Sequence, residues 1–291
     1  DLDRELVLFT PNFAGRREYE AAFAAGVRVT LDNLYPLTAW PEVFEGRELF
    51  VRLDIGEGTG HHQHVTTAGV RSKFGVGIEE VQSLHNACVG IGARITGLHV
   101  HGGSGIYDPL HWQRVALGLT EVAAGLPDIR VLDLGGGLGV PERQGDAPLD
   151  LNAVDSGLAE VRSAFPDYEL WLEPGRFLVS EAGVLLAKVT QTKIKSGVRF
   201  VGVATGMNSL IRPALYGAYH RIVNLSRLHQ PADRLMTVVG PICESGDRIG
   251  RDRLLPECRE GDVLLIANAG AYGHAMSSHY NLREPATEVM I

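Results

Sequence analysis

Five short motifs combine residue types that could hold a phosphate, fix an aromatic nitrogen and offer an acid to a reacting carbon. Three of them end short apolar runs: His99-Val-His-Gly-Gly-Ser104, Leu132-Asp-Leu-Gly-Gly-Gly137 and Glu173-Pro-Gly-Arg176. Two more follow, Cys243-Glu-Ser-Gly-Asp247 and Gly270-Ala-Tyr-Gly273. A carboxylate at a pyridine nitrogen keeps that nitrogen protonated and makes the ring an electron sink. Together the motifs predict a site for pyridoxal 5'-phosphate (PLP).

The glycine run is the candidate phosphate loop. Gly135, Gly136 and Gly137 follow an apolar strand and have no Cβ, so their backbone N–H groups can approach a phosphate. A tight turn is the alternative interpretation. The spacing is not that of a dinucleotide-binding G-x-G-x-x-G loop, because Gly139 falls at the wrong offset. Ser104 is a second candidate donor to the phosphate.

Glu173 and Arg176 place a carboxylate at a strand end and a guanidinium three residues later, with Gly175 between them. A guanidinium can bind a phosphate or a carboxylate through two parallel N–H groups. The alternative interpretation is a structural ion pair at a strand-to-helix turn. His101 could lie flat on the cofactor ring.

Two histidine patterns suggest a metal site instead. Alternation on a strand points His99 and His101 to the same face, so their spacing permits two metal ligands. The loop His61-His62-Gln63-His64 offers three more histidines. Neither pattern is followed by a further ligand at a recognisable spacing, so we predict no metal.

Cys243 beside Glu244 is a candidate proton donor. A thiol acts as a general acid when its pKa lies near ambient pH. The commoner fate of cysteine is a small buried side chain, which we predict for Cys88 and Cys258.

Arg212, Tyr216 and Tyr272 add a cation and two phenols in the second half of the chain. An arginine on a loop there suits a substrate carboxylate. It could equally be a surface charge.

The composition excludes several classes of partner. A net charge of −8 in 291 residues leaves no basic surface for a phosphate backbone, so we predict no nucleic acid. The apolar runs have the length of strands, so we predict no membrane span. Three cysteines form no even disulfide framework, which favours the cytoplasm.

Strands alternate with helices from residue 5 to about residue 180, which predicts a parallel sheet. The strand-like runs are Glu5–Thr10, Val27–Asp32, Leu49–Ile55, Ile95–His101, Ile129–Leu134 and Tyr168–Glu173. The helical runs are Arg16–Ala25, Ile78–Ile91, Trp112–Ala124 and Leu151–Phe165. Six units are two short of a closed (β/α)8 barrel, whose active site lies at the carboxyl ends of the strands. A doubly wound open sheet would also accommodate six strands.

Beyond residue 182 the pattern changes to short strands separated by Pro, Gly and Asp. These strands are Val184–Lys195, Phe200–Ala204, Leu235–Val239 and Val263–Ala267. We predict two domains, a PLP-binding barrel domain over 1–182 and a mainly antiparallel β domain over 183–291.

The ordered set of motifs, from about Glu5 to Ile291, resembles the fold-type III PLP-dependent decarboxylases, and most of all the diaminopimelate decarboxylase family. Ser72-Lys-Phe-Gly75 and Met207–Tyr216 belong to the resemblance too. It implies an alanine racemase-like (β/α)8 barrel with a C-terminal β domain, and a homodimer with shared active sites. The implied reaction converts meso-2,6-diaminopimelate to L-lysine and CO2, the last step of lysine biosynthesis.

The resemblance also implies a role for each motif residue. For the cofactor, it places His101 on the ring, Glu173 at the ring nitrogen, Tyr272 in further contact, and Ser104, Gly135–Gly137, Gly175 and Arg176 around the phosphate. For the substrate, it places Arg212 and Tyr216 at the distal carboxylate, with Arg176 and Tyr272 also in reach. Cys243 as proton donor and Glu244 at the distal amine would enter the partner subunit's site.

One element of the family pattern has no counterpart in the sequence. The family forms its Schiff base on a lysine in a Tyr-Ala-x-Lys-Ala-Asn segment of the first barrel strand. The four lysines here, Lys73, Lys188, Lys193 and Lys195, have other surroundings. The first unit of the chain instead resembles the third barrel strand of the family. We therefore expect an interior piece of a longer enzyme, and no decarboxylation by the 291 residues alone.

Two alternatives stay open at this point. The chain could belong to a non-catalytic homologue that binds or regulates. It could also act on ornithine, arginine or carboxynorspermidine. An arginine aimed at a distal carboxylate would be left unpaired by ornithine, at a cost of several kcal/mol.

Overall fold

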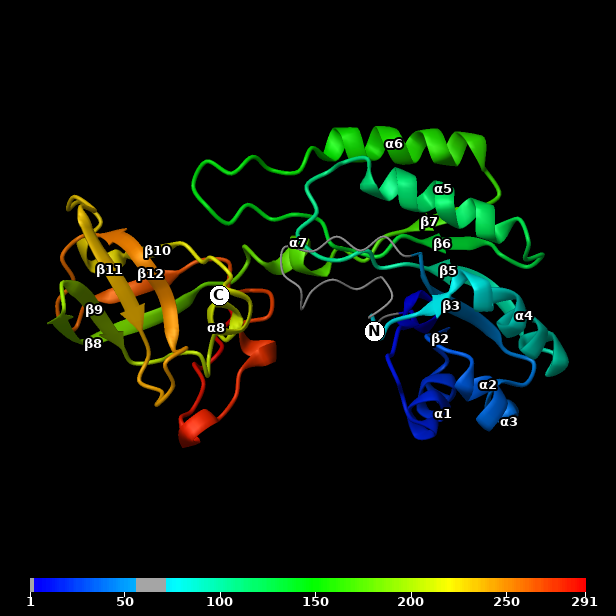
Figure 1. Ribbon diagram of the computed structural model, residues 1–291, viewed down its shortest axis with the longest axis horizontal. Coiled ribbons are helices and arrows are strands. Elements are labelled where there is room, and N and C mark those ends of the chain that lie inside the picture. Colours follow the sequence, from blue (N-terminus) through cyan, green and yellow to red (C-terminus); the bar gives the residue numbers. More distant parts are fainter. Residues whose placement is uncertain (1–2, 56–71) are drawn as a thin grey trace. The chain divides into compact units, whose positions relative to one another are not determined.

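The computed structural model describes residues 3–55 and 72–291, which form two compact units (Figure 1). The first unit comprises Asp1–Gly139 and Leu149–Pro174, and the second comprises Val140–Pro148 and Gly175–Ile291. The predicted domain boundary after residue 182 stays a prediction. The loop His61–His64 lies outside the described residues. Within them, no helix has the length and apolar character needed to cross a bilayer.

The first unit contains an all-parallel sheet, as predicted. The strand order is β1-β2-β3-β5-β6-β7, and β4 also pairs with β3. The six strands of this order overlap the six predicted runs, which confirms an incomplete parallel barrel. Their bounds are β1 Leu8–Phe9, β2 Arg28–Leu31, β3 Glu48–Asp54, β4 Val76–Gly77, β5 Arg94–His99, β6 Val131–Asp133 and β7 Glu169–Trp171.

Helices lie along the outer side of this sheet (Figure 1). α1 is closed at both ends by local signals: the Glu18 carboxylate accepts the Gly15 N–H at 2.8 Å, and Gly26 ends the helix in the left-handed region with φ 73°. The Asp150 side chain caps α6. The bounds are α1 Arg16–Ala25, α2 Tyr35–Ala39, α3 Pro41–Phe44, α4 Val81–Gly90, α5 His111–Ala123 and α6 Leu151–Ala164, with short 3-10 turns at Arg4–Leu6 and Ile78–Glu80.

Strand alternation separates an apolar face from a polar one. Val51, Leu98 and Leu132 are almost completely buried and share one face. The residues that follow each of them lie side by side in register, because Arg52 pairs with His99 and His99 with Asp133. A row of polar side chains therefore crosses the sheet at the carboxyl ends of its strands.

The second unit is a six-stranded sheet of order β10-β13-β8-β9-β11-β12. All neighbours are antiparallel except β9 and β11, so the prediction of a mainly antiparallel β region is confirmed. β10 and β12 were not predicted, because β10 has three residues and four charges interrupt β12. The bounds are β8 Leu185–Lys195, β9 Val198–Val203, β10 Ile222–Asn224, β11 Arg234–Val239, β12 Arg248–Leu255 and β13 Val263–Ile266.

Short helical turns carry several motif residues of the second unit. α7 spans Gly175–Val179 and contains Arg176, and α8 spans Arg212–Tyr216. Both are too short for a helical periodicity to be visible in the sequence. Further 3-10 turns lie at Leu225–Arg227, His274–Met276 and Tyr280–Leu282.

Candidate active site

Glu173 follows β7, and a buried histidine holds its carboxylate. Nε2 of His99 donates to Oε2 of Glu173 at 3.2 Å. The His99 side chain is 1% exposed, whereas 38% of the Glu173 side chain is exposed. Burial alone would raise the pKa of Glu173, but the hydrogen bond from His99 and the charge of Arg52 outweigh it and lower that pKa. Glu173 therefore offers an ionised, accessible carboxylate in a fixed position.

His101 lies half-buried beyond the end of β5. Its Nδ1 accepts the N–H of Gly136 at 3.3 Å, which leaves the proton on Nε2. Burial, reinforced by the charge of Arg52, lowers the pKa of His101 to about 4. The imidazole is thus neutral at pH 7, and a neutral ring is suited to stacking on an aromatic cofactor.

The glycine turn Gly135–Gly137 lies against the backbone of two neighbouring strand ends. A Cβ at these three positions would overlap the carbonyl oxygens of Val100, Glu173 and Gly103, respectively. Gly135 and Gly137 also have φ angles of 67° and 89°, which favour glycine. The run is therefore required by close packing, and this packing fixes Glu173 relative to the loop that contains His101 and Ser104.

Among the residues that the structure describes, two of the three turn N–H groups have hydrogen-bond partners. Gly135 donates to Asp133 Oδ1 at 3.0 Å, and Gly136 donates to His101. A phosphate on this turn would therefore meet Gly137, or compete for the longer 3.3 Å bond of Gly136. The half-buried Ser104 lies next to Gly103, whose carbonyl packs on Gly137.

Asp133 is a site residue that the sequence analysis did not assign. It is 1% exposed, and burial raises its pKa to about 6. One ligand atom each of His99, Asp133 and Glu173 lie within 4.8 Å of one another, a spacing that a metal ion could use. Hydrogen bonds from His99 and Gly135 already engage both carboxylates, so the cluster needs no ion to explain it. The absence of a metal stays a prediction.

The second unit gathers two arginines around one carboxylate. Arg176 Nη2 donates to Oε1 of Glu142, and Arg212 Nη2 lies 3.7 Å from the same oxygen. Both guanidinium groups are buried, with side chains 8% and 4% exposed. Burial and the charge of Arg176 lower the pKa of Arg212, but an arginine stays charged in proteins. Tyr216, four residues after Arg212, is half-buried.

A buried histidine fixes the second of these arginines. His220 Nδ1 donates to the carbonyl oxygen of Ala267 at 2.8 Å, and Nε2 accepts from Arg212 Nη1 at 3.0 Å. His220 is completely buried, and this burial lowers its pKa to about 4. The neutral imidazole therefore holds Arg212 without adding charge.

Tyr272 projects from a tightly packed loop of the second unit. A Cβ at Gly270 would overlap the carbonyl oxygen of Val179, and one at Gly273 would overlap that of Ala269. Tyr272 itself has φ 57° and is 51% exposed. A positive φ in a tyrosine is uncommon and is often retained at functional sites. The motif thus presents an exposed phenol on a rigid support.

Cys243 and Glu244 are exposed on the loop between β11 and β12. Asp247 anchors this loop, accepting N–H groups of Met207 and Ile242 at 2.7 Å each. No hydrogen bond or ion pair among the described residues joins Cys243 or Glu244 to either arginine. Cys88 and Cys258 are buried, as predicted.

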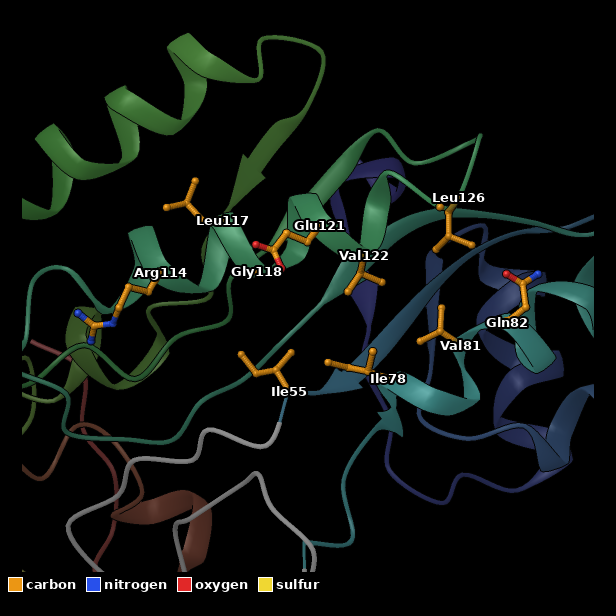
Figure 2. A pocket seen from close by; sticks show the side chains of 11 residues that line it. Ile55, Ile78, Val81, Gln82, Arg114, Leu117, Gly118, Glu121, Val122 and Leu126 are labelled. Carbon is orange, nitrogen blue, oxygen red and sulfur yellow. The ribbon is translucent and has the colours of Figure 1, made fainter.

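A separate apolar groove lies between α4 and α5 of the first unit (Figure 2). Ile78, Val81, Leu117, Val122 and Leu126 line much of it. No residue of the five motifs does so, and the groove offers little acid–base chemistry. We therefore do not place the site there.

The comparisons with known proteins agree with the fold and the motifs. Residues 34–270 match the family model described as pyridoxal-dependent decarboxylase, C-terminal sheet domain. The chain belongs to the pyridoxal-dependent decarboxylases.

The relatives define the family within this class. A diaminopimelate decarboxylase of Methanothermobacter thermautotrophicus is 38% identical over 99% of this chain and 70% of its own length. The diaminopimelate decarboxylase of Archaeoglobus fulgidus is 35% identical over 99% of this chain and 72% of its own length. The solved structure of a diaminopimelate decarboxylase of Helicobacter pylori, complexed with L-lysine, is 29% identical in sequence. The match covers 96% of this chain and 71% of that one, with a TM-score of 0.84. The chain is a member of the diaminopimelate decarboxylase family.

Proposed function

We propose that the enzyme to which these residues belong decarboxylates meso-2,6-diaminopimelate to L-lysine and CO2 with PLP as its cofactor. Membership of the family and the name of its relatives support the reaction. The observation that carries the proposal is the carboxylate of Glu173, ionised, partly exposed and held at 3.2 Å by His99. The L-lysine in the H. pylori structure supports the product.

The residues of the first unit suit the cofactor. When bound, PLP supplies an electron sink for the charge left on the substrate carbon as CO2 departs. Glu173 would keep a proton on the ring nitrogen, and the neutral imidazole of His101 would cover the ring. Ser104 and the turn Gly135–Gly137 would hold the phosphate, with the N–H of Gly137, or that of Gly136 in place of its bond to His101, as donor. Gly175 and Arg176, which follow Glu173 in the sequence, are assigned to the phosphate too.

The residues of the second unit suit the substrate. Arg212 and Tyr216 hold the distal carboxylate, and the buried charge of Arg212 favours a ligand that brings such a carboxylate. Ornithine and similar amines have no distal carboxylate and lack this contact. Arg176 and Tyr272 are assigned to the substrate as well, the exposed phenol also contacting the cofactor.

Cys243 and Glu244 are assigned to the partner subunit's site in a homodimer, Cys243 as the proton donor and Glu244 at the distal amine. Their exposure supports this, because a proton donor for another subunit must be accessible. The mass of the protein in solution tests the dimer, and a monomer with full activity would exclude this assignment. The cytoplasmic location and the inactivity of the 291 residues alone stay predictions.

The substitution Glu173→Gln in the holoenzyme tests the proposal. It keeps the shape of the side chain and removes its charge, so kcat should fall by roughly 100-fold or more. The absorption band of bound PLP should persist, which separates chemistry from cofactor loss. Glu169→Gln, on the same strand, is the matched control and should keep the kcat of the original enzyme. An unchanged kcat in the Glu173 variant would remove Glu173 from the reaction.

A further inference from the structure

We infer that Glu142 occupies, within the protein, the position of a ligand carboxylate between Arg176 and Arg212. A substrate carboxylate would then bind the arginine pair by displacing the Glu142 side chain. The identity of that substrate rests on the proposed function. The place of Glu142 in the arginine pair does not.

The contacts describe an anion site with its anion supplied by the chain. Oε1 of Glu142 accepts from Arg176 and lies 3.7 Å from Arg212 Nη2. The guanidinium groups are nearly inaccessible, whereas 24% of the Glu142 side chain is exposed. The cations are therefore fixed in the interior, and the carboxylate reaches them from the surface.

Charge favours binding of a further anion. Two guanidinium groups and one carboxylate leave one net positive charge, and the neutral His220 adds none. Tyr216 also lies close enough to Arg212 to interact with its charge. An unbalanced cation in a buried position attracts carboxylates strongly.

The geometry shows that Glu142 fills this site incompletely. The 3.7 Å contact to Arg212 is too long for a hydrogen bond. Nε of Arg176 is buried without a hydrogen-bond partner among the described residues. A ligand carboxylate with two well-placed oxygens could satisfy both groups, as guanidinium–carboxylate pairs prefer.

The backbone of Glu142 is anchored, so only its side chain needs to move. Its N–H donates to Asp146 Oδ2 at 3.1 Å, and Asn268 Nδ2 donates to the preceding carbonyl of Pro141 at 3.0 Å. The side chain alone can rotate towards solvent from this fixed segment. Glu142 thereby acts as an internal competitor for the arginine pair. A ligand with a distal carboxylate replaces the Glu142 side chain, and a ligand without a distal carboxylate leaves it in place.

The test measures the binding of pimelate, a seven-carbon dicarboxylate without amines, to the holoenzyme by calorimetry. Glu142→Gln removes the competing charge, so its Kd for pimelate should fall about tenfold. Glu142→Asp keeps the charge on a shorter side chain and should give a smaller decrease. Glu257→Gln, an exposed change in the same unit, should leave the Kd unchanged. In the double variant with Arg212→Gln, the gain should disappear.

Unchanged or weaker pimelate binding by folded Glu142→Gln would overturn the inference, because Glu142 would then only support the arginines. Chloride titration of unliganded Glu142→Asp gives a second readout if Glu142→Gln fails to fold. Stronger chloride binding than in the original protein supports competition by Glu142, and equal chloride binding contradicts it. Tighter pimelate binding in an enzyme that does not turn over diaminopimelate would leave the inference standing and reject the proposed function. Turnover of diaminopimelate without tighter pimelate binding in Glu142→Gln would reject the inference and leave the proposed function standing.

Discussion

The two units each hold a carboxylate at the centre of their motif residues, but they hold it in opposite ways. In the first unit, Glu173 is bound by one histidine and keeps 38% of its side chain exposed. In the second unit, Glu142 is bound by two arginines that are themselves buried. The first arrangement makes a carboxylate available, whereas the second makes cations available behind a carboxylate. Under the proposed function, the first unit would serve the reaction chemistry and the second would select the substrate.

The elements that support the two sets of residues differ as well. The first group, the polar residues around Glu173, lies at strand ends, and cross-strand register brings Arg52, His99 and Asp133 side by side. The second group surrounds Glu142 and comes from loops and short turns that are distant in sequence. Hydrogen bonds and ion pairs join its members, which are Glu142, Arg176, Arg212 and His220. Strand register can be read from a period of two, but no comparable pattern predicts loop contacts.

Arg212→Gln should produce the largest effect and test whether the second unit selects the substrate. A buried cation for the distal carboxylate is lost, so kcat/KM for diaminopimelate should fall about 1000-fold, or about 4 kcal/mol. The change should appear mainly in KM, whereas Glu173→Gln should act on kcat. Steady-state kinetics of both variants separate the two roles.

The control for this comparison is Arg199→Gln, an exposed change on β9 of the same unit, which should leave both parameters unaltered. If Arg212→Gln lowered kcat and left KM unchanged, the division of labour between the units would be wrong.

Gly136→Ala should test the rigid packing of the first unit. The new Cβ would overlap the Glu173 carbonyl oxygen, so we expect a loss of about 3 kcal/mol in the free energy of unfolding. Gly118→Ala in α5 is the matched control, because no described atom outside its chain neighbours and the backbone of its own helix lies within 4 Å of its Cβ position. It should stabilise the protein by about 0.5–1 kcal/mol through helix propensity. Urea denaturation of both variants measures the difference, and equal stabilities would contradict the packing argument.

The sequence predicted the first group better than the second, for reasons visible in individual residues. The six strand runs placed Glu173, His101 and the glycines at strand ends, where the structure has them. The role of His99 was missed, because alternation with His101 suggested paired metal ligands instead. Asp133 lies within the motif Leu132–Gly137, and an acid two residues before the first glycine was the available signal.

Glu142 and His220 were not found at all from the sequence. Glu142 lies in an irregular segment, and its partners Arg176 and Arg212 are far away in the chain. His220 was an unremarked residue in a loop between α8 and β10. Only the folded chain shows that it sits between a carbonyl and a guanidinium.

His220→Asn should give the smallest effect, and its pH dependence distinguishes a buried neutral histidine from simple packing. The pKa of His220 is about 4 in the folded protein and about 6.5 in an unfolded chain. Between these values the unfolded state binds more protons, so this histidine lowers the stability of the original protein as the pH falls. The penalty of the substitution should therefore shrink by roughly 2 kcal/mol between pH 7 and pH 5.

Denaturation at the two pH values measures that difference between His220→Asn and the original protein, so contributions of other titrating groups cancel. The variant should also bind pimelate more weakly, since Arg212 loses the acceptor that holds its Nη1. A substitution penalty that is the same at both pH values would mean that His220 is not held neutral. Arg212 would then owe its position to Glu142 and to packing alone, and the second unit would lack the fixed cation that distinguishes it from the first.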